Sequence, residues 1–181
     1  MKMNTPNKLT ILRVIMIPFF VACMLIPFGN GANKLIALVI FVVASLTDWL
    51  DGYLARRDNL VTNFGKFMDP LADKLLVGAA MICMVALQTL PAWIVVIIIS
   101  REFIISGLRL VAADNGVVIA ASWWGKIKTA TQMIMIIVLI TDLSGVFNVM
   151  EQALIYASLV LTVISLVDYL IKNKAVLFMQ E

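Results

Sequence analysis

The chain has no histidine, and only 14% of its 181 residues are charged. The absence of histidine excludes histidine general bases, histidine metal ligands and nucleophile systems of the Ser-His or Cys-His type. Cysteine is also scarce. Cys23 and Cys83 each stand alone inside an apolar stretch, so we expect both to be small buried hydrophobic side chains.

Apolar residues, in contrast, make up 62% of the chain, and its mean hydropathy is +1.02. A soluble domain of this size could not bury so much apolar surface, which indicates a lipid environment. Backbone polar groups in lipid need internal partners, and the apolar runs are continuous rather than alternating. The sequence therefore predicts an all-α integral membrane protein built as a helical bundle.

Six apolar stretches approach the ~20 residues needed to cross the hydrocarbon layer of a membrane. Glycine, proline and charged residues separate these stretches, and the sequence shows no internal repeat or second domain. We therefore expect one membrane domain, residues 1–181, with six transmembrane helices. The predicted spans are residues 9–28, 34–54, 70–90, 91–113, 126–143 and 150–171.

Basic residues predict the orientation of this bundle. Of the 14 lysines and arginines, all but Lys34 fall in the segments that six alternating spans would place on one side. The positive-inside rule makes that side cytoplasmic, together with both termini. The polar first ten residues and the missing small-residue cleavage site predict no removable signal peptide. The expected location is the plasma membrane, as a multi-pass protein.

Four aspartates stand at the cytoplasmic ends of the second and third spans. Asp48 and Asp51 are three residues apart, and Asp69 and Asp73 are four apart, so each pair lies on one helix face. A short connection would bring the two faces together. Like charges at such close range need a cation between them, and oxygen ligands select Mg²⁺, Mn²⁺ or Ca²⁺. Four carboxylates are enough for two ions.

Simpler interpretations exist for single members of this quartet. Asp69 precedes Pro70 and could cap a helix that begins there. Asp48 and Asp51 could pair with the neighbouring arginines in a salt-bridge patch, although they oppose the helix dipole as caps. None of these interpretations covers all four residues, and intramembrane acids usually mark a functional site.

The acids belong to a longer pattern: Asp48-x2-Asp51-Gly52-x2-Ala55-Arg56-x8-Gly65-x3-Asp69-x3-Asp73. This pattern resembles the signature of the CDP-alcohol phosphotransferases at every position. The resemblance implies a bundle of six transmembrane helices, commonly a homodimer. It also implies an enzyme that displaces CMP from a CDP-linked lipid or alcohol with a hydroxyl nucleophile and a divalent metal.

Three outer motifs resemble the bacterial phosphatidylglycerophosphate synthases within that family. The first lies between Asn4 and Arg13, the second comprises Ser100-Arg101-Glu102-Phe103 with Leu108-Arg109, and the third lies between Gly125 and Gln132. The implied reaction joins CDP-diacylglycerol and sn-glycerol 3-phosphate to give phosphatidylglycerophosphate and CMP. The implied partners are these two substrates, membrane lipids and a second copy of the chain, with no nucleic acid.

The resemblance also assigns roles to residues, with an active site on the cytoplasmic face. Asp48, Asp51, Asp69 and Asp73 would bind two ions of Mg²⁺ or Mn²⁺, and Asp73 would also be the general base. The CDP site would comprise Asn7, Thr10, Gly52, Ala55, Arg56 and Gly65. The acceptor phosphate needs cations, for which the candidates are Arg13, Arg101, Arg109, Lys126 and Lys128.

Alternatives remain open for these cations and for the function. Lys126 and Lys128 could simply extend to the membrane interface, and Arg101 could form a buried ion pair with Glu102. The same family chemistry could use phosphatidylglycerol, serine or inositol phosphate as the acceptor. Intramembrane carboxylates also occur in divalent-cation transporters, but the apolar outer halves of the spans argue against transport. A scaffold protein would not need the aspartate and glycine spacing.

Overall fold

The computed structural model describes residues 5–28, 32–57, 63–117, 119–120, 122–142 and 146–174. Within its helices, the side chains at 5–7, 48–57, 63–70, 73 and 146–147 lie outside the description. The described residues form helices and connecting turns without any strand, which confirms the all-α prediction.

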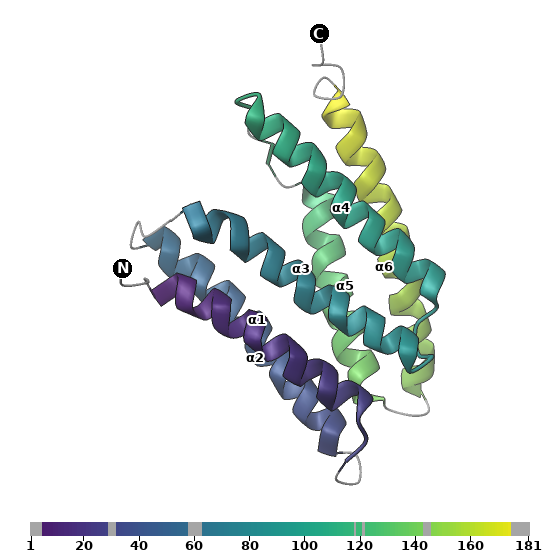
Figure 1. Cartoon of the computed structure of the whole chain (residues 1–181). Helices are drawn as coiled ribbons and strands as arrows, with labels where there is room; N and C mark the ends of the chain where they lie inside the picture. Colours follow the sequence, from purple (N-terminus) through teal and green to yellow (C-terminus); the bar gives the residue numbers. More distant parts are fainter. Residues whose placement is uncertain are drawn as a thin grey trace. The chain divides into compact units, whose positions relative to one another are not determined.

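Six helices follow one another along the described chain in the predicted order (Figure 1). They are α1 (Thr5–Leu25), α2 (Ala32–Arg57), α3 (Asn63–Ala86), α4 (Ala92–Asp114), α5 (Trp123–Thr141) and α6 (Val146–Lys172). The chain divides into two compact units, the first comprising Met1–Thr89 with Leu139–Asp142 and the second Leu90–Val138 with Leu143–Glu181. The prediction of one membrane domain stays a prediction.

In the first unit, α1 packs against both α2 and α3, and α2 contacts α3. The buried faces carry many alanines, which let helix backbones approach closely. Phe20 of α1 and Phe41 of α2 are also buried and contact each other, with their ring centroids 5.9 Å apart. The alanines buried in α2 and α3 are Ala37, Ala44, Ala72 and Ala80.

In the second unit, α4 packs against α6. Arg101 of α4 donates a hydrogen bond to Ser165 of α6. Farther along both helices, Arg109 of α4 donates one to Tyr169 of α6. Because both partners advance together, α4 and α6 run in the same direction, as Figure 1 also shows. Parallel fourth and sixth helices are what alternating crossings of a membrane require.

Local hydrogen bonds fix the ends of the helices that carry the predicted acceptor cations. Gly116 has a φ of +74° and closes α4, with its N–H donating to the Ala113 carbonyl and the Val117 N–H donating to the Ala112 carbonyl. This pattern is a Schellman motif. At the start of α5, the Ser122 hydroxyl accepts a hydrogen bond of 3.1 Å from the Gly125 N–H, which is an N-cap.

Four of the described helices begin three or more residues before the predicted apolar spans, and α3 differs most. It begins at Asn63 rather than at residue 70, so Asp69 and Pro70 lie inside it and Asp69 is not its N-terminal cap. The helices α1, α5 and α6 begin three or four residues before their spans, at Thr5, Trp123 and Val146. In α3 and α5 the backbone hydrogen bonding of the helix extends into polar or interfacial residues beyond the apolar stretch, and hydropathy alone cannot detect that extension.

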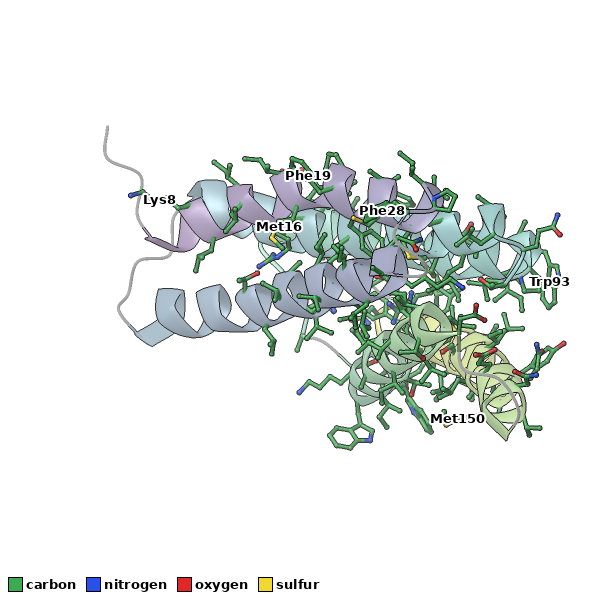
Figure 2. The ribbon with its side chains drawn as sticks, turned by 90° about the horizontal axis from the view of Figure 1, so that it is seen from below. Lys8, Met16, Phe19, Phe28, Trp93 and Met150 are labelled. Carbon is green, nitrogen blue, oxygen red and sulfur yellow. The ribbon has the colours of Figure 1, made fainter. Side chains whose placement is uncertain are left out.

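The outer faces of the helices are apolar, which agrees with a membrane helical bundle. Phe19 is 64% exposed and Trp93 is 54% exposed, and both lie on outward-facing positions in Figure 2. Two helical stretches, Lys8–Leu25 and Asn148–Lys172, are long and apolar enough to cross a membrane. The shorter apolar stretches Ala32–Thr47 and Lys74–Ala86 lie in α2 and α3. Six complete spans remain a prediction.

Candidate functional site: an aspartate quartet and a buried cation network

All four aspartates of the predicted metal site lie on helices. Asp48 and Asp51 belong to α2, and Asp69 and Asp73 belong to α3. Residues three or four apart share one face of a helix, so the observed helices agree with the predicted pairing of these aspartates. Their side chains lie outside the described part of the structure, so the metal ligation itself stays a prediction.

The helix bounds place these residues at matched depths. Asp51 and Asp69 each lie six residues from the helix end at the α2–α3 connection, which is Arg57 in α2 and Asn63 in α3. At about 1.5 Å per residue, both positions are roughly 9 Å from those ends. Asp48 and Asp73 lie about one turn deeper. Two contacting helices joined at that end can therefore present four carboxylates in two layers.

A buried arginine lies against α2 close to this region. Arg13 of α1 has no exposed surface, and its Nε donates a hydrogen bond of 3.2 Å to the Ala44 carbonyl. Ala44 precedes Asp48 by one helical turn. The Ala44 carbonyl also accepts from the Thr47 hydroxyl at 2.7 Å. A buried positive charge beside a helix turn that carries an aspartate lowers the electrostatic cost of holding acids in an apolar bundle.

The residues predicted to bind CDP are only partly described. Thr10 lies on α1 one turn before Arg13 and is completely buried. The backbone positions of the other five are helical, and Gly65, predicted in a connection, belongs to α3. The side chains of Asn7, Gly52, Ala55, Arg56 and Gly65 lie outside the described residues.

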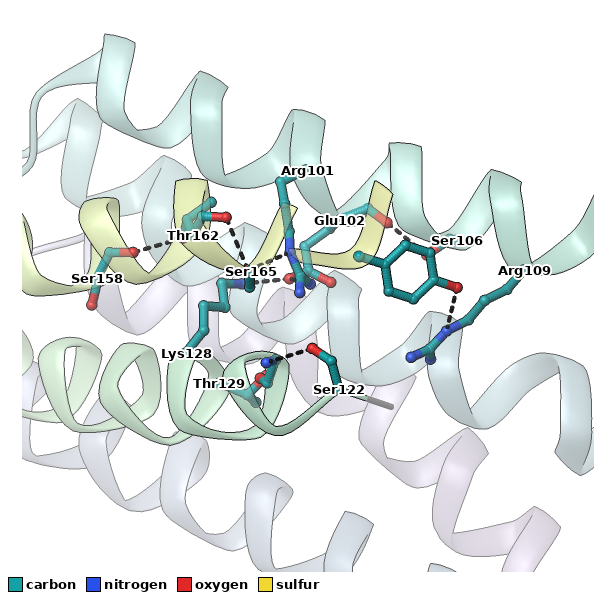
Figure 3. A network of polar contacts seen from close by, with 12 residues as sticks. Arg101, Glu102, Ser106, Arg109, Ser122, Lys128, Thr129, Ser158, Thr162 and Ser165 are labelled. Atoms are coloured by element: carbon teal, nitrogen blue, oxygen red, sulfur yellow. Dashed lines mark hydrogen bonds and ion pairs between the residues drawn. The ribbon is translucent and has the colours of Figure 1, made fainter. Parts of the chain in front are cut away.

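Three charged side chains meet inside the second unit (Figure 3). The Nη1 of Arg101 lies 3.1 Å from the Oε1 of Glu102, and the same oxygen accepts a hydrogen bond from the Nζ of Lys128. Arg101 is 7% exposed and Lys128 only 1%. Two cations share this carboxylate, so the trio carries a net positive charge in a region of low dielectric constant, where an anion is strongly attracted. We name Arg101, Glu102 and Lys128 the cation trio.

The structure separates alternatives that the sequence left open. Arg101 does form the predicted ion pair with Glu102, and Lys128 joins it. Lys128 is buried, so interfacial extension does not describe it, whereas Lys126 is exposed as that interpretation requires. Arg13 lies in the first unit, and the other four predicted acceptor cations lie in the second.

Arg109, two turns beyond Arg101 on α4, has an aromatic partner. Its Nε donates to the Tyr169 hydroxyl at 3.3 Å, and its guanidinium carbon lies 5.7 Å from the centre of the Tyr169 ring. Tyr169 is 1% exposed, whereas Arg109 is solvent- or lipid-accessible. The tyrosine therefore restrains one end of a guanidinium whose remaining N–H groups can bind an anion.

Sequence reasoning missed the contribution of α6. Ser158, Thr162, Ser165 and Tyr169 recur at helical spacing along one buried face of this mainly apolar helix. The Ser165 hydroxyl accepts a hydrogen bond of 3.1 Å from Arg101 and donates one of 2.9 Å to the Thr162 carbonyl. The four-, three- and four-residue spacing of these polar groups was the signal that could have revealed them.

Comparison with known proteins agrees with these features. Residues 3–164 match the sequence model of the CDP-alcohol phosphatidyltransferase family. A CDP-diacylglycerol–glycerol-3-phosphate 3-phosphatidyltransferase of Bacillus subtilis is 53% identical over 72% of this chain and 73% of its own. The protein of that name from Haemophilus influenzae is 44% identical over 94% of this chain and 93% of its own. A probable phosphatidylglycerophosphate synthase of Mycobacterium tuberculosis is 42% identical over 92% of this chain and 79% of its own.

The matched range covers most of the chain and spans the positions of the aspartate quartet and of the cation trio. Enzymes of this family are generally metal-dependent, which agrees with a quartet of carboxylates. The chain belongs to the CDP-alcohol phosphatidyltransferase family.

Proposed function

We propose that this chain transfers the phosphatidyl group of CDP-diacylglycerol to sn-glycerol 3-phosphate, giving phosphatidylglycerophosphate and CMP in phospholipid biosynthesis. The observation that carries the proposal is the name that its relatives share, including one at 44% identity over nearly the whole chain. The buried cation trio supports it further, because a phosphate-bearing acceptor requires more cations than free serine does.

Asp48, Asp51, Asp69 and Asp73 fit two divalent cations, Mg²⁺ or Mn²⁺. Their donor atoms are all carboxylate oxygens, which suit hard cations, and their backbone positions lie at matched depths on α2 and α3. When bound, the ions would neutralise the pyrophosphate and the leaving CMP. Arg13 adds a fixed positive charge near Asp48.

The transfer itself forms one O–P bond and breaks another. The primary hydroxyl of glycerol 3-phosphate attacks the phosphorus that bears diacylglycerol, and the O–P bond to CMP breaks. Asp73 accepts the hydroxyl proton as the general base. Arg56 contacts phosphate oxygens of the CDP group, which Asn7, Thr10, Gly52, Ala55 and Gly65 surround.

Arg101, Lys128 and Arg109 bind the phosphate of the acceptor, and Lys126 adds charge at the edge. Arginine can hold phosphate through two parallel N–H bonds, whereas lysine acts as a point charge. The cation trio is already assembled and buried in the described structure, so little reorganisation is needed when the acceptor binds.

The chain lies in the plasma membrane with six spans, both termini and its active site on the cytoplasmic side, and acts as a homodimer. The distribution of its basic residues supports this orientation. The parallel course of α4 and α6 supports alternating crossings. A site at the cytoplasmic surface gives the lipid substrate lateral access and the water-soluble acceptor access from the cytoplasm.

The direct test is CMP release by purified protein in detergent with CDP-diacylglycerol and Mg²⁺ or Mn²⁺. Glycerol 3-phosphate, phosphatidylglycerol, serine and inositol phosphate are supplied one at a time, with and without a chelator. We expect chelator-sensitive release with glycerol 3-phosphate alone. Release with a different acceptor would reassign the substrate within the family, and no release from folded protein with any acceptor would refute the proposal.

A further inference from the structure

We infer that α6 is the positioning element of the acceptor site, with Ser165 holding Arg101 and Tyr169 holding Arg109. This inference rests on the proposed function and names residues outside every motif that predicted it. α6 contributes no cation of its own to the set proposed to bind phosphate. Its two polar contacts nevertheless reach both arginines of α4.

The hydrogen bonds of Ser165 have a definite direction. A hydroxyl has one proton, and Ser165 donates it to the Thr162 carbonyl of its own helix at 2.9 Å. Its lone pairs are then available to the Nε of Arg101, which donates to it at 3.1 Å. Glu102 binds the Nη1 of the same guanidinium. Arg101 is therefore held at two of its three nitrogens before any ligand binds.

The remaining nitrogen of Arg101 faces α5. Its Nη2 lies 3.3 Å from the position that a Cβ at Gly125 would occupy, so a larger residue there would displace the guanidinium by a few tenths of an ångström. Ser165 on one side and Gly125 on the other thus determine the plane of the guanidinium. Bidentate binding of a phosphate depends on that plane.

Tyr169 acts on Arg109 in a similar way. A free arginine side chain loses rotamer entropy when it is fixed. The phenol hydroxyl and ring of Tyr169 restrict Arg109 in advance, because they bind its Nε and lie beside its guanidinium. Tyr169 is itself fixed by burial. Loss of either α6 partner should weaken acceptor binding and leave the lipid substrate unaffected.

The same helix supplies matched controls. Ser158 lies on the same buried face as Ser165 and is equally inaccessible, but its hydroxyl has no hydrogen-bond partner among the residues that the structure describes. Tyr156 is 54% exposed on the outer face of α6, so it controls for removal of a tyrosine hydroxyl. These pairs separate positioning from general effects on the stability of α6.

The experiment measures KM for each substrate in Ser165→Ala, Tyr169→Phe, Ser158→Ala and Tyr156→Phe. We expect KM for glycerol 3-phosphate to rise roughly fivefold in Ser165→Ala and about threefold in Tyr169→Phe. We expect kcat and KM for CDP-diacylglycerol to stay within about twofold, since neither residue touches the lipid substrate. Inhibition by inorganic phosphate should weaken by the same factors, and the two control variants should match the wild type.

Unchanged KM for glycerol 3-phosphate in both Ser165→Ala and Tyr169→Phe would overturn the inference while leaving the proposed function intact. A parallel rise in KM for both substrates, matched by Ser158→Ala, would also overturn it, because that result indicates general loosening of α6. Wild-type protein without any release of CMP on addition of glycerol 3-phosphate would instead refute the proposed function.

Discussion

The buried faces of α1–α3 are mainly apolar and rich in alanine, whereas those of α4–α6 combine apolar residues with hydroxyls and charges. Of the polar residues buried in the described chain, Thr10, Arg13 and Asn33 lie in the first group, and Arg101, Lys128, Gln132, Ser158, Thr162 and Ser165 lie in the second. Lipid offers no hydrophobic force between helices, so close approach and hydrogen bonds are two separate ways to hold a bundle together. The first group uses mainly close approach, and the second adds hydrogen bonds and ion pairs that would also prepare an anion site.

This difference has a consequence for charged residues. Charged residues on α2 and α3 should contribute to catalysis and have little effect on folding, because the packing of these helices depends on small side chains. Charges in the cation trio should serve both binding and folding, because they are buried partners of one another.

The largest expected effect is on activity, in Asp73→Asn. Loss of a general base that also ligates metal should lower the rate of CMP release by about 10²- to 10⁴-fold, with the thermal unfolding midpoint nearly unchanged. Asp114→Asn, an exposed aspartate at the end of α4, serves as the control and should retain full activity. A variant that loses stability together with activity would show that Asp73 has a packing role.

Lys128→Met and Lys126→Met form the next test, two residues apart on α5. Removing Lys128 takes a buried partner from Glu102, which should lower the free energy of unfolding by about 3 kcal/mol and raise KM for glycerol 3-phosphate. Removing the exposed Lys126 should change the free energy of unfolding by less than about 0.5 kcal/mol. Equal losses of stability in the two variants would contradict the distinction between buried and interfacial lysines.

Close packing in the first group is tested by enlarging one alanine. Ala37 has no exposed surface, so Ala37→Leu should force α2 away from its neighbours and lower the free energy of unfolding by about 1–3 kcal/mol. Val39→Leu, at a position 53% exposed on the same helix, should change little. The measurement is thermal unfolding in detergent, and tolerance of leucine at both positions would show that α2 is not closely packed.

The smallest expected effect comes from a pair of helical glycines. Gly107→Ala meets nothing within 4 Å, so it should stabilise α4 by up to about 1 kcal/mol through helix propensity. Gly125→Ala meets Arg101 at 3.3 Å, so it should gain less stability and raise KM for glycerol 3-phosphate about twofold. Identical gains in stability with no change in KM would show that Gly125 does not limit Arg101.

Much of the fold could be predicted from the apolar stretches, because helices that face lipid are apolar over their length. The starts of α3 and α5 could not be predicted from these stretches. Backbone hydrogen bonding continues through Asn63–Asp69 in α3 and through the tryptophans before Gly125 in α5. These starts depend on local bonds such as the Ser122 cap, which a count of apolar residues does not include.

The candidate site was predictable to a similar extent. Spacing alone selected the aspartates as candidate ligands, because three- and four-residue intervals have direct meaning on a helix, and their ligation stays a prediction. Spacing could not tell Lys126 from Lys128, since their difference depends on which side of α5 faces Glu102. Ser165 and Tyr169 were missed because single polar residues in an apolar helix usually mean packing, and only their partners on α4 reveal another role.

The most direct measurement compares glycerol 3-phosphate with glycerol as acceptors in the wild type and in Lys128→Met. The ratio of the two kcat/KM values does not depend on how much of each protein is folded. If the cation trio recognises the acceptor phosphate, the wild type should strongly prefer glycerol 3-phosphate, and Lys128→Met should lose roughly tenfold or more of that preference. An unchanged preference in Lys128→Met would show that the phosphate is recognised elsewhere and would contradict the role proposed for the trio.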